Sequence, residues 1–169
     1  MSATSHTSSK RRWVGAAAAV VALAITAAAC GPAALASPGA YGPPDAVTST
    51  VYNRTNADRA ARGLGGLSWD GRLYDLAAEW AQYMADARVF QHRNLAAAID
   101  APGFESYAAL GENILVGPEG INGDQMENAW LASPSHYANI VGNYDSMGVA
   151  LGHGADGNVR AVVNFGRHY

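Results

Sequence analysis

Residues 70–85 read DGRLYDLAAEWAQYMA. Apolar side chains recur in this stretch at intervals of three and four residues, which places them on one face of an α-helix. Ser68 or Asp70 supplies a residue type suited to the N-cap of that helix. The stretch therefore predicts an amphipathic helix that buries one face in a core. The residues of that face are Leu73, Leu76, Ala77, Trp80 and Met84.

A second helix is expected before this stretch, over residues 46–62. Val47, Val51 and Thr55 share one face of it, and glycines from Gly63 onward end it. Polar residues on the same helix allow two interpretations, a functional surface or a set of anchors that hold loops through buried hydrogen bonds. We favour anchors, because a buried polar group is costly unless it is bonded. These polar residues are Asn53, Arg54, Asn56 and Arg59.

Two shorter helices are predicted after residue 120. The first spans residues 123–131, and the second begins at Ser133 and Pro134 and runs through Ile140. Serine caps helices and proline suits the first helical position, so Ser133 is interpreted as a cap. The inward face expected for the first of these helices contains Met126, Ala129 and Trp130.

The remaining chain predicts loops and then a hairpin. Residues 90–116 show no clear period, and we expect irregular structure there. Strands are expected over residues 147–151 and 160–165, joined through the Gly-Ala-Asp-Gly turn at 154–157. Helices come first and a hairpin last, and this order predicts an α+β fold in which helices pack on an antiparallel sheet.

Length and charge limit the classes of function. The chain has 169 residues, which favours one domain, and a net charge of -3. Beyond residue 36 it contains eight arginines, no lysine and fourteen acidic residues, a net charge of -6. This balance argues against nucleic-acid binding and against a polybasic patch that docks on anionic lipids.

The N-terminus has the three parts of a secretory signal peptide over residues 1–36. Lys10, Arg11 and Arg12 precede an apolar stretch, and Ala34-Leu35-Ala36 forms an A-x-A cleavage site. A membrane-spanning helix is the alternative, but the stretch is mostly alanine and is broken at Gly31 and Pro32. We therefore expect cleavage near Ala36, secretion, and no membrane span in the mature form.

Cys30 offers a second route to the cell surface. It is the single cysteine, and Ala27-Ala28-Ala29-Cys30 resembles a bacterial lipobox that lacks the usual leucine, so lipidation at Cys30 is the alternative to free secretion. Cleavage at Ala36 would leave no cysteine and hence no disulfide. Residues 37–45 are rich in proline and glycine and predict a linker, and residues 46–169 form the expected domain, which we interpret as a monomer.

Side chains suited to chemistry concentrate in the middle of the chain. His92, Glu112 and His136 could together bind a divalent metal, with the carboxylate orienting one imidazole ring. No close metal-ligand spacing is present, so ordinary polar roles remain open for all three. His153 and His168 lie near a turn and the C-terminus, and we expect solvated side chains there.

Several segments, in their order along the chain, resemble the bacterial CAP domain family, which includes cysteine-rich secretory proteins, venom allergens and plant pathogenesis-related proteins. The resemblance covers nearly everything from Val47 to Gly166 and implies an α-β-α sandwich around a small antiparallel sheet. The segments that carry it are Asn53-Arg54-Thr55-Asn56, Leu67-Ser68-Trp69-Asp70, Phe90-Gln91-His92, Gly111-Glu112-Asn113-Ile114, Ser133-Pro134-Ser135-His136, Asn139-Ile140, Gly148-Val149-Ala150 and Val163-Asn164-Phe165-Gly166.

The resemblance also implies a cleft lined by a tetrad of histidines and glutamates. His92, Glu112 and His136 match three of its members. Where the eukaryotic pattern has the second glutamate this chain has Ser133, and Glu127, the nearest glutamate, is not assigned that role. We expect weak, exchangeable binding of a divalent metal such as zinc by His92 and His136, with no metal required for folding.

Glu112 and its neighbour Asn113 are expected in the cleft, where Glu112 orients one of the rings. Both residues could instead serve only to anchor the irregular segment over residues 90–116 to the rest of the domain.

Three classes of function follow from these residues. The favoured one is a secreted, non-enzymatic binding module for a small apolar ligand or a cell-envelope component. A metal-dependent hydrolase, peptidase-like or directed at the cell wall, is the first alternative; Ser133 and Ser135 lie near His136, but no G-x-S-x-G motif is present. A purely structural surface protein is the second.

Overall fold

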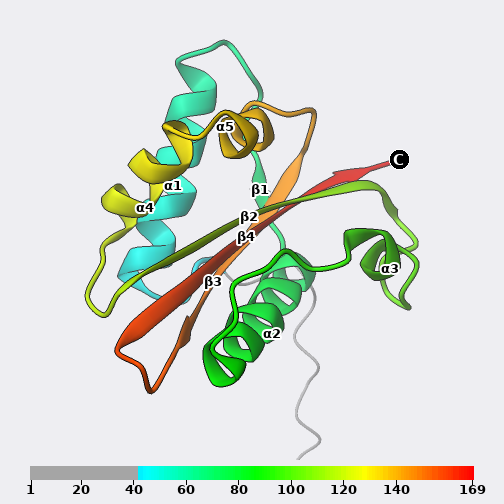
Figure 1. Ribbon diagram of the computed structural model, residues 1–169. Helices are drawn as coiled ribbons and strands as arrows, with labels where there is room; N and C mark the ends of the chain where they lie inside the picture. The colour runs from blue at the N-terminus through cyan, green and yellow to red at the C-terminus, as the bar shows by residue number, and fades with distance from the viewer. Residues whose placement is uncertain (1–41) are drawn as a thin grey trace, which may run out of the picture. The chain divides into compact units, whose positions relative to one another are not determined.

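The computed structural model describes residues 42–169 (Figure 1). The signal peptide, Cys30 and the first part of the linker lie outside the described residues. The elements are α1 (Ala46–Ala60), β1 (Ser68–Trp69), α2 (Gly71–Ala87), α3 (Leu95–Ile99), β2 (Tyr107–Pro118), α4 (Gly123–Leu131), α5 (Pro134–Ile140), β3 (Ser146–His153) and β4 (Asn158–His168). None of the helices in residues 42–169 is long and apolar enough to cross a membrane.

The four strands form one sheet in the order β1-β3-β4-β2. β4 pairs antiparallel with β3 on one side and with β2 on the other, whereas β1 pairs parallel with β3. The predicted α+β class is therefore confirmed. The expected antiparallel sheet holds for three strands, and the two-residue strand β1 makes the sheet mixed.

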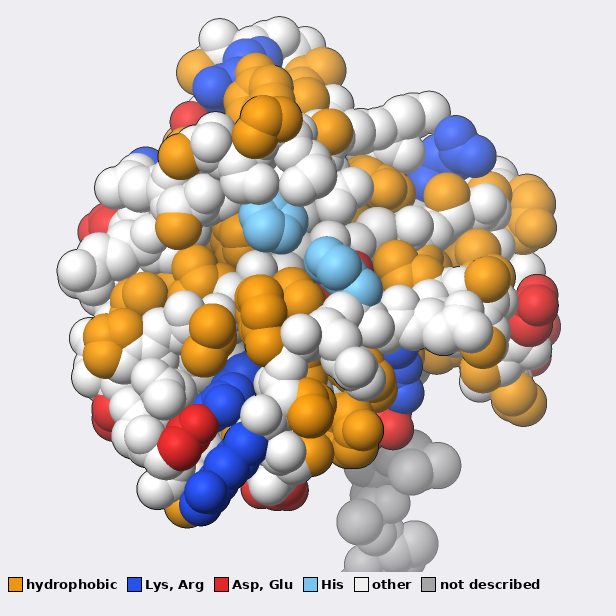
Figure 2. All heavy atoms as spheres, viewed as in Figure 1, with side chains coloured by type: hydrophobic (Ala, Val, Ile, Leu, Met, Phe, Trp, Pro, Cys, Tyr) orange, Lys and Arg blue, Asp and Glu red, His pale blue; other side chains and the backbone are white. Residues whose placement is uncertain are grey.

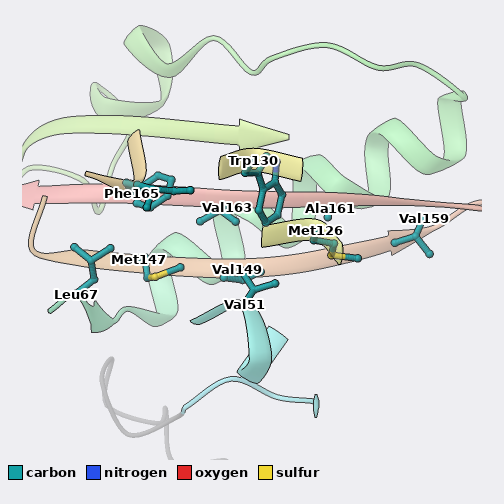
Figure 3. Packing of buried hydrophobic residues seen from close by; sticks show 11 residues of the cluster. Val51, Leu67, Met126, Trp130, Met147, Val149, Val159, Ala161, Val163 and Phe165 are labelled. Carbon is teal, nitrogen blue, oxygen red and sulfur yellow. The ribbon is translucent and has the colours of Figure 1, made fainter. Parts of the chain in front are cut away.

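Helices cover both faces of the sheet, as the α-β-α sandwich requires (Figure 1). On one face, side chains of α1, α4 and α5 pack with Val149 of β3 and Val163 of β4. Figure 3 shows Trp130 and Met126 pointing onto this face of the strands. On the other face, α2 packs on Ala150 and Val162, the next residues along the same strands, because successive side chains of a strand point to opposite faces.

Helix α2 lies directly on the backbone of β3. Gly148 and Gly152 flank Ala150 on the face that α2 covers, so three small residues follow one another there. A Cβ atom on Gly148 would collide with the backbone nitrogen of Tyr74, and one on Gly152 with the carbonyl oxygen of Ala81. Four of the five residues of the predicted apolar face are therefore buried, and Trp80 partly so, because the face of β3 beneath α2 carries only small residues.

Two of the four polar residues of α1, Asn56 and Arg59, serve as anchors, as the sequence predicts. The guanidinium of Arg59 donates to the carbonyl oxygens of Gly65, Ile140, Gly142 and Tyr144 at 2.8–3.2 Å. Asn56 exchanges two hydrogen bonds with the backbone of Leu67. These contacts join α1 to the loop that follows it and to the end of α5.

The prediction of irregular structure over residues 90–116 is wrong. The segment contains α3 and most of β2, a strand that pairs with β4 along its whole length. Gly111, Glu112, Asn113 and Gly117 interrupt the alternation of apolar residues on which a sequence-based strand assignment depends. β2 is a strand because its backbone hydrogen-bonds to β4, a contact with a distant segment that the sequence of β2 itself does not indicate.

Two details of the later helices also differ from expectation. Ala129 is exposed, and the carboxylate of Glu127 is buried in its place on the inward side of α4. Ser133 is the N-cap residue of α5, but its side chain makes no capping hydrogen bond; the hydroxyl lies 3.3 Å from that of Ser135. Pro134 at the first turn remains consistent with the predicted helix start.

We predict that Gly148→Ala lowers the free energy of unfolding by at least about 2 kcal/mol, because α2 must move away from β3 to make room for the methyl group. Gly65→Ala is the control: a Cβ atom there meets nothing within 4 Å, and we expect a change of less than about 0.5 kcal/mol. Urea denaturation of both variants measures the difference, and equal stability would show that α2 is not in backbone contact with the strand.

Candidate functional site

The site forms at the outer edge of β2, where two consecutive residues face opposite layers. Glu112 lies on the side of the sheet that α2 covers, and Asn113 on the side of α5, because strand side chains alternate. β2 is the last strand of the sheet, so both layers end beside it. One histidine reaches this edge from each layer, and their ring centroids lie 6.4 Å apart. Figure 2 shows two histidine side chains next to each other at the surface.

His92 is held by the buried carboxylate of Glu112. Its Nδ1 atom lies 2.8 Å from Glu112 Oε1, and the backbone N–H of Arg93 donates to the same oxygen at 3.0 Å. The side chain of Glu112 is 1% exposed, whereas that of His92 is 58% exposed. Because Oε1 accepts the Arg93 bond, we assign the shared proton to His92 Nδ1, which leaves Nε2 free to bind a ligand.

Burial acts on the charge state of this carboxylate. Loss of solvent raises the pKa of Glu112, and the bonds from His92 and Arg93 partly offset that shift because they stabilise the charged form.

His136 approaches from α5 and is fixed through its backbone. Asn113 Nδ2 donates to the carbonyl oxygen of His136 at 3.1 Å. Asn139 Nδ2 donates to Asn113 Oδ1 at 2.9 Å and to the carbonyl oxygen of Glu112 at 3.0 Å. Partial burial lowers the pKa of His136, with a smaller contribution from His92, and this shift favours the neutral form of its ring.

The two rings lie close enough to act together. Their centroids are 6.4 Å apart and their planes are inclined by 51°. His92 and His136 are 44 residues apart in sequence, so only the fold brings them together. Glu112 and Asn113, which are neighbours in the chain, each hold one of them.

The loop that carries His92 is fastened to α2 on both sides of the histidine. α2 ends at Ala87, and the next residue, Arg88, adopts a left-handed conformation with φ of 55° and turns the chain back. Trp80 Nε1 then donates to the carbonyl oxygen of Gln91, and Arg93 donates to the carbonyl oxygen of Leu76 and pairs with Glu79. These bonds hold the chain on both sides of His92 against α2.

Sequence reasoning did not identify three of the residues that build the site. Trp80 was assigned only to the core, and Arg93 and Asn139 were given no role. Asn139 stands in one of the segments that resemble the family. Neither Trp80 nor Arg93 carries a sequence signal for its role, because both act through backbone carbonyl groups.

Comparison with known proteins identifies the family. The profile of the CAP, or cysteine-rich secretory protein, family matches residues 52–165. The chain belongs to this family. No curated protein matches this CAP domain.

Solved structures agree with the assignment. An outer surface protein of Borrelia burgdorferi is 25% identical, with a TM-score of 0.63 over 70% of this chain and 90% of that one. An extracellular SCP-domain protein of Bacillus anthracis is 25% identical, with a TM-score of 0.57 over 71% of this chain and 40% of that longer one. NaASP2, solved with Zn²⁺, is 16% identical, with a TM-score of 0.53 over 75% of this chain and 88% of that one, and shows the fold alone.

Glu127 and Ser133, the residues considered for the fourth tetrad position, form their side-chain hydrogen bonds with residues other than His92 and His136. Glu127 is fully buried in this CAP domain, and both its carboxylate oxygens lie 3.1–3.2 Å from the hydroxyl of Thr55 in α1. The hydroxyl of Ser133 contacts that of Ser135. Within residues 42–169, neither serine is hydrogen-bonded to His136. Two further histidines of residues 42–169 are partly exposed as expected: His153 pairs with the carboxylate of Glu119, and His168 with that of Asp145.

The donors at the β2 edge suit a weakly held zinc ion. Neutral imidazoles bind zinc at about 2.1 Å, which puts two ring centroids on one tetrahedral ion roughly 5 Å apart. The observed 6.4 Å therefore requires a modest movement of the exposed His92 ring. Residues 42–169 contain no group of three or more His, Cys, Asp or Glu side chains placed to hold an ion. Two imidazoles would thus supply the protein ligands, and water the others.

Glu127 makes the stability of the domain depend on pH. Burial raises its pKa to about 7, and the nearby Asp58 adds to the shift. A carboxyl whose pKa is raised by folding favours the folded state below its unfolded pKa, and that contribution is lost as the pH rises through the folded value.

We therefore predict that the free energy of unfolding of the wild type falls more between pH 5 and pH 8 than that of Glu127→Gln, by about 2 kcal/mol. Urea denaturation at the two pH values measures both changes. The glutamine variant keeps the size of the side chain and a partner for Thr55, and it corrects for other titrating groups. Parallel pH dependence in the two proteins would contradict a shifted pKa at Glu127.

Proposed function

We propose that this CAP domain is an extracellular binding module whose ligand site is the β2 edge between His92 and His136. The observation that carries the proposal is the pair of His92 with buried Glu112, which fixes the ring and leaves Nε2 free beside His136. An imidazole that is hydrogen-bonded through one nitrogen to a buried carboxylate and exposed to solvent is arranged to bind a ligand through its other nitrogen.

A divalent metal such as zinc is one proposed ligand, bound weakly by His92 and His136 while Glu112 orients the first ring. Structural zinc sites have four protein ligands, so a site with two binds more weakly and exchanges its metal with solvent. When bound, the metal would supply a Lewis acid for an anionic group of a second ligand. Folding does not depend on it, since both sheet faces carry apolar cores of their own.

The second proposed ligand is a small apolar molecule or a component of the cell envelope. The expected signal peptide supports export, and the similar proteins of Borrelia burgdorferi and Bacillus anthracis are described as outer surface and extracellular. We propose free secretion after cleavage near Ala36, as a monomer, with anchoring through a lipid on Cys30 as the alternative.

We predict that zinc binds the untagged wild-type protein at pH 7.5 and that His92→Ala and His136→Ala each weaken binding at least about tenfold, because each removes one of two protein ligands. Binding should also weaken at pH 5.5, where protonated imidazole cannot act as a ligand. Isothermal titration calorimetry measures both effects.

His153→Ala is the matched control for this titration, because His153 is equally exposed and pairs with Glu119 rather than with the site. Equal zinc affinity in His92→Ala and the wild type would refute the metal site. Zinc-dependent cleavage of casein or cell-wall material that His92→Ala abolishes would favour the hydrolase alternative instead.

We further predict that the wild-type protein is retained by isolated cell-wall material or retains a labelled fatty acid after delipidation, above an albumin-corrected background, and that His92→Ala reduces this retention. A sedimentation or filter-binding assay measures it. No retention of either probe, together with no zinc binding, would favour a purely structural surface protein.

A further inference from the structure

Asn164 of β4 is a buried polar residue that the site described above does not use. Its side chain is fully buried, and neither its amide nitrogen nor its amide oxygen has a hydrogen-bond partner among the described residues. Buried amides in folded proteins are almost always bonded, so such a group requires a specific explanation. Asparagine is also disfavoured in the middle of a strand, where an aliphatic residue would pack better.

The strand register places Asn164 directly beside Glu112. The two residues are Cα partners in the antiparallel β2–β4 pair, and side chains at such positions lie on the same face, with Cβ atoms roughly 5 Å apart. On the other side, Asn164 is opposite Gly148 of β3, which has no side chain. Glu112 is therefore the cross-strand neighbour that can reach the amide.

Glu112 has an unpartnered carboxylate oxygen that could accept a hydrogen bond from the Asn164 amide. Oε1 accepts the bonds from His92 and Arg93, whereas Oε2 is buried and has no partner among the described residues. An amide nitrogen is a donor and a carboxylate oxygen an acceptor, so the two unpartnered groups are complementary.

None of the buried residues of α2 competes for either group. α2 covers this face, and its buried residues are all apolar, with Leu73, Leu76 and Ala77 among them. The first carboxylate oxygen is therefore bonded to the loop that carries His92, whereas the second is buried without a partner among the described residues.

We propose that Asn164 is a positioning residue for the site: its amide donates a hydrogen bond to Glu112 Oε2, directly or through one buried water molecule, and so keeps Oε1 on His92 Nδ1. Held at both oxygens, the carboxylate cannot rotate away from the ring, and His92 keeps its proton on Nδ1 and its free Nε2 toward His136. This inference deepens the proposed function, on which its zinc readout rests, while its effect on the His92 ring does not require a metal.

The test compares Asn164→Val with Asn164→Thr in the purified protein. Valine and threonine have the same shape and both suit a strand, but only threonine keeps a hydrogen-bond donor. The first readout is the tautomer of His92, measured without metal by ¹⁵N nuclear magnetic resonance of the ring nitrogens at one fixed pH. The second is zinc affinity by calorimetry.

We expect the Nδ1–H tautomer of His92 in the wild type and in Asn164→Thr, its partial or complete loss in Asn164→Val, and zinc binding about tenfold weaker in the valine variant only. An unchanged tautomer in Asn164→Val would overturn the proposal, and so would equal loss in both variants, because the retained donor would then have no effect. A higher urea midpoint for Asn164→Val than for the wild type would also overturn it, since an amide without a partner is better replaced by an apolar group.

The outcomes separate this proposal from the metal site. A tautomer change in Asn164→Val without zinc binding to the wild type refutes the metal site and supports the role of Asn164. If both variants bind zinc as the wild type does and the tautomer is unchanged, the result supports the metal site and refutes the role of Asn164. A crystal structure of the wild type distinguishes the direct bond from the water-mediated one.

Discussion

The fixed register between β2 and β4 is the constraint on which the site depends. A shift of one residue would exchange the faces of all β2 side chains, placing Glu112 on the side of α5 and Asn113 on the side of α2. The observed register instead aligns Glu112 with Asn164 and puts each polar residue beside the layer that carries its histidine. One strand edge thus brings together two histidines that come from opposite layers.

Polar groups in this domain are buried where they fix geometry. Arg59 bonds four backbone carbonyl oxygens, and Asn139 satisfies the outward carbonyl oxygen of Glu112 at the open edge of β2. Trp130 does the same for the carbonyl oxygen of Ile114. Side chains from α4 and α5 therefore cover an edge that would otherwise be free to pair with another strand.

The sequence predicts the regular elements well and the site only in part. α2 and the β3–β4 hairpin were predictable because periodic apolar residues and a glycine turn specify them locally. β2 was not, because its glycines and its adjacent Glu112 and Asn113 reflect contacts with distant segments. The inward carboxylate of Glu127 was also missed, since a glutamate on a helix normally indicates a solvent-exposed position.

Family resemblance pointed to His92, Glu112 and His136, and the structure places the three at one edge. The most direct measurement is a crystal structure of the zinc-soaked protein with anomalous diffraction at the zinc absorption edge. The account predicts an anomalous peak in contact with both His92 Nε2 and the ring of His136, with Glu112 still bonded to His92 Nδ1. A peak that contacts only one of the two histidines, or zinc bound only elsewhere, would contradict it.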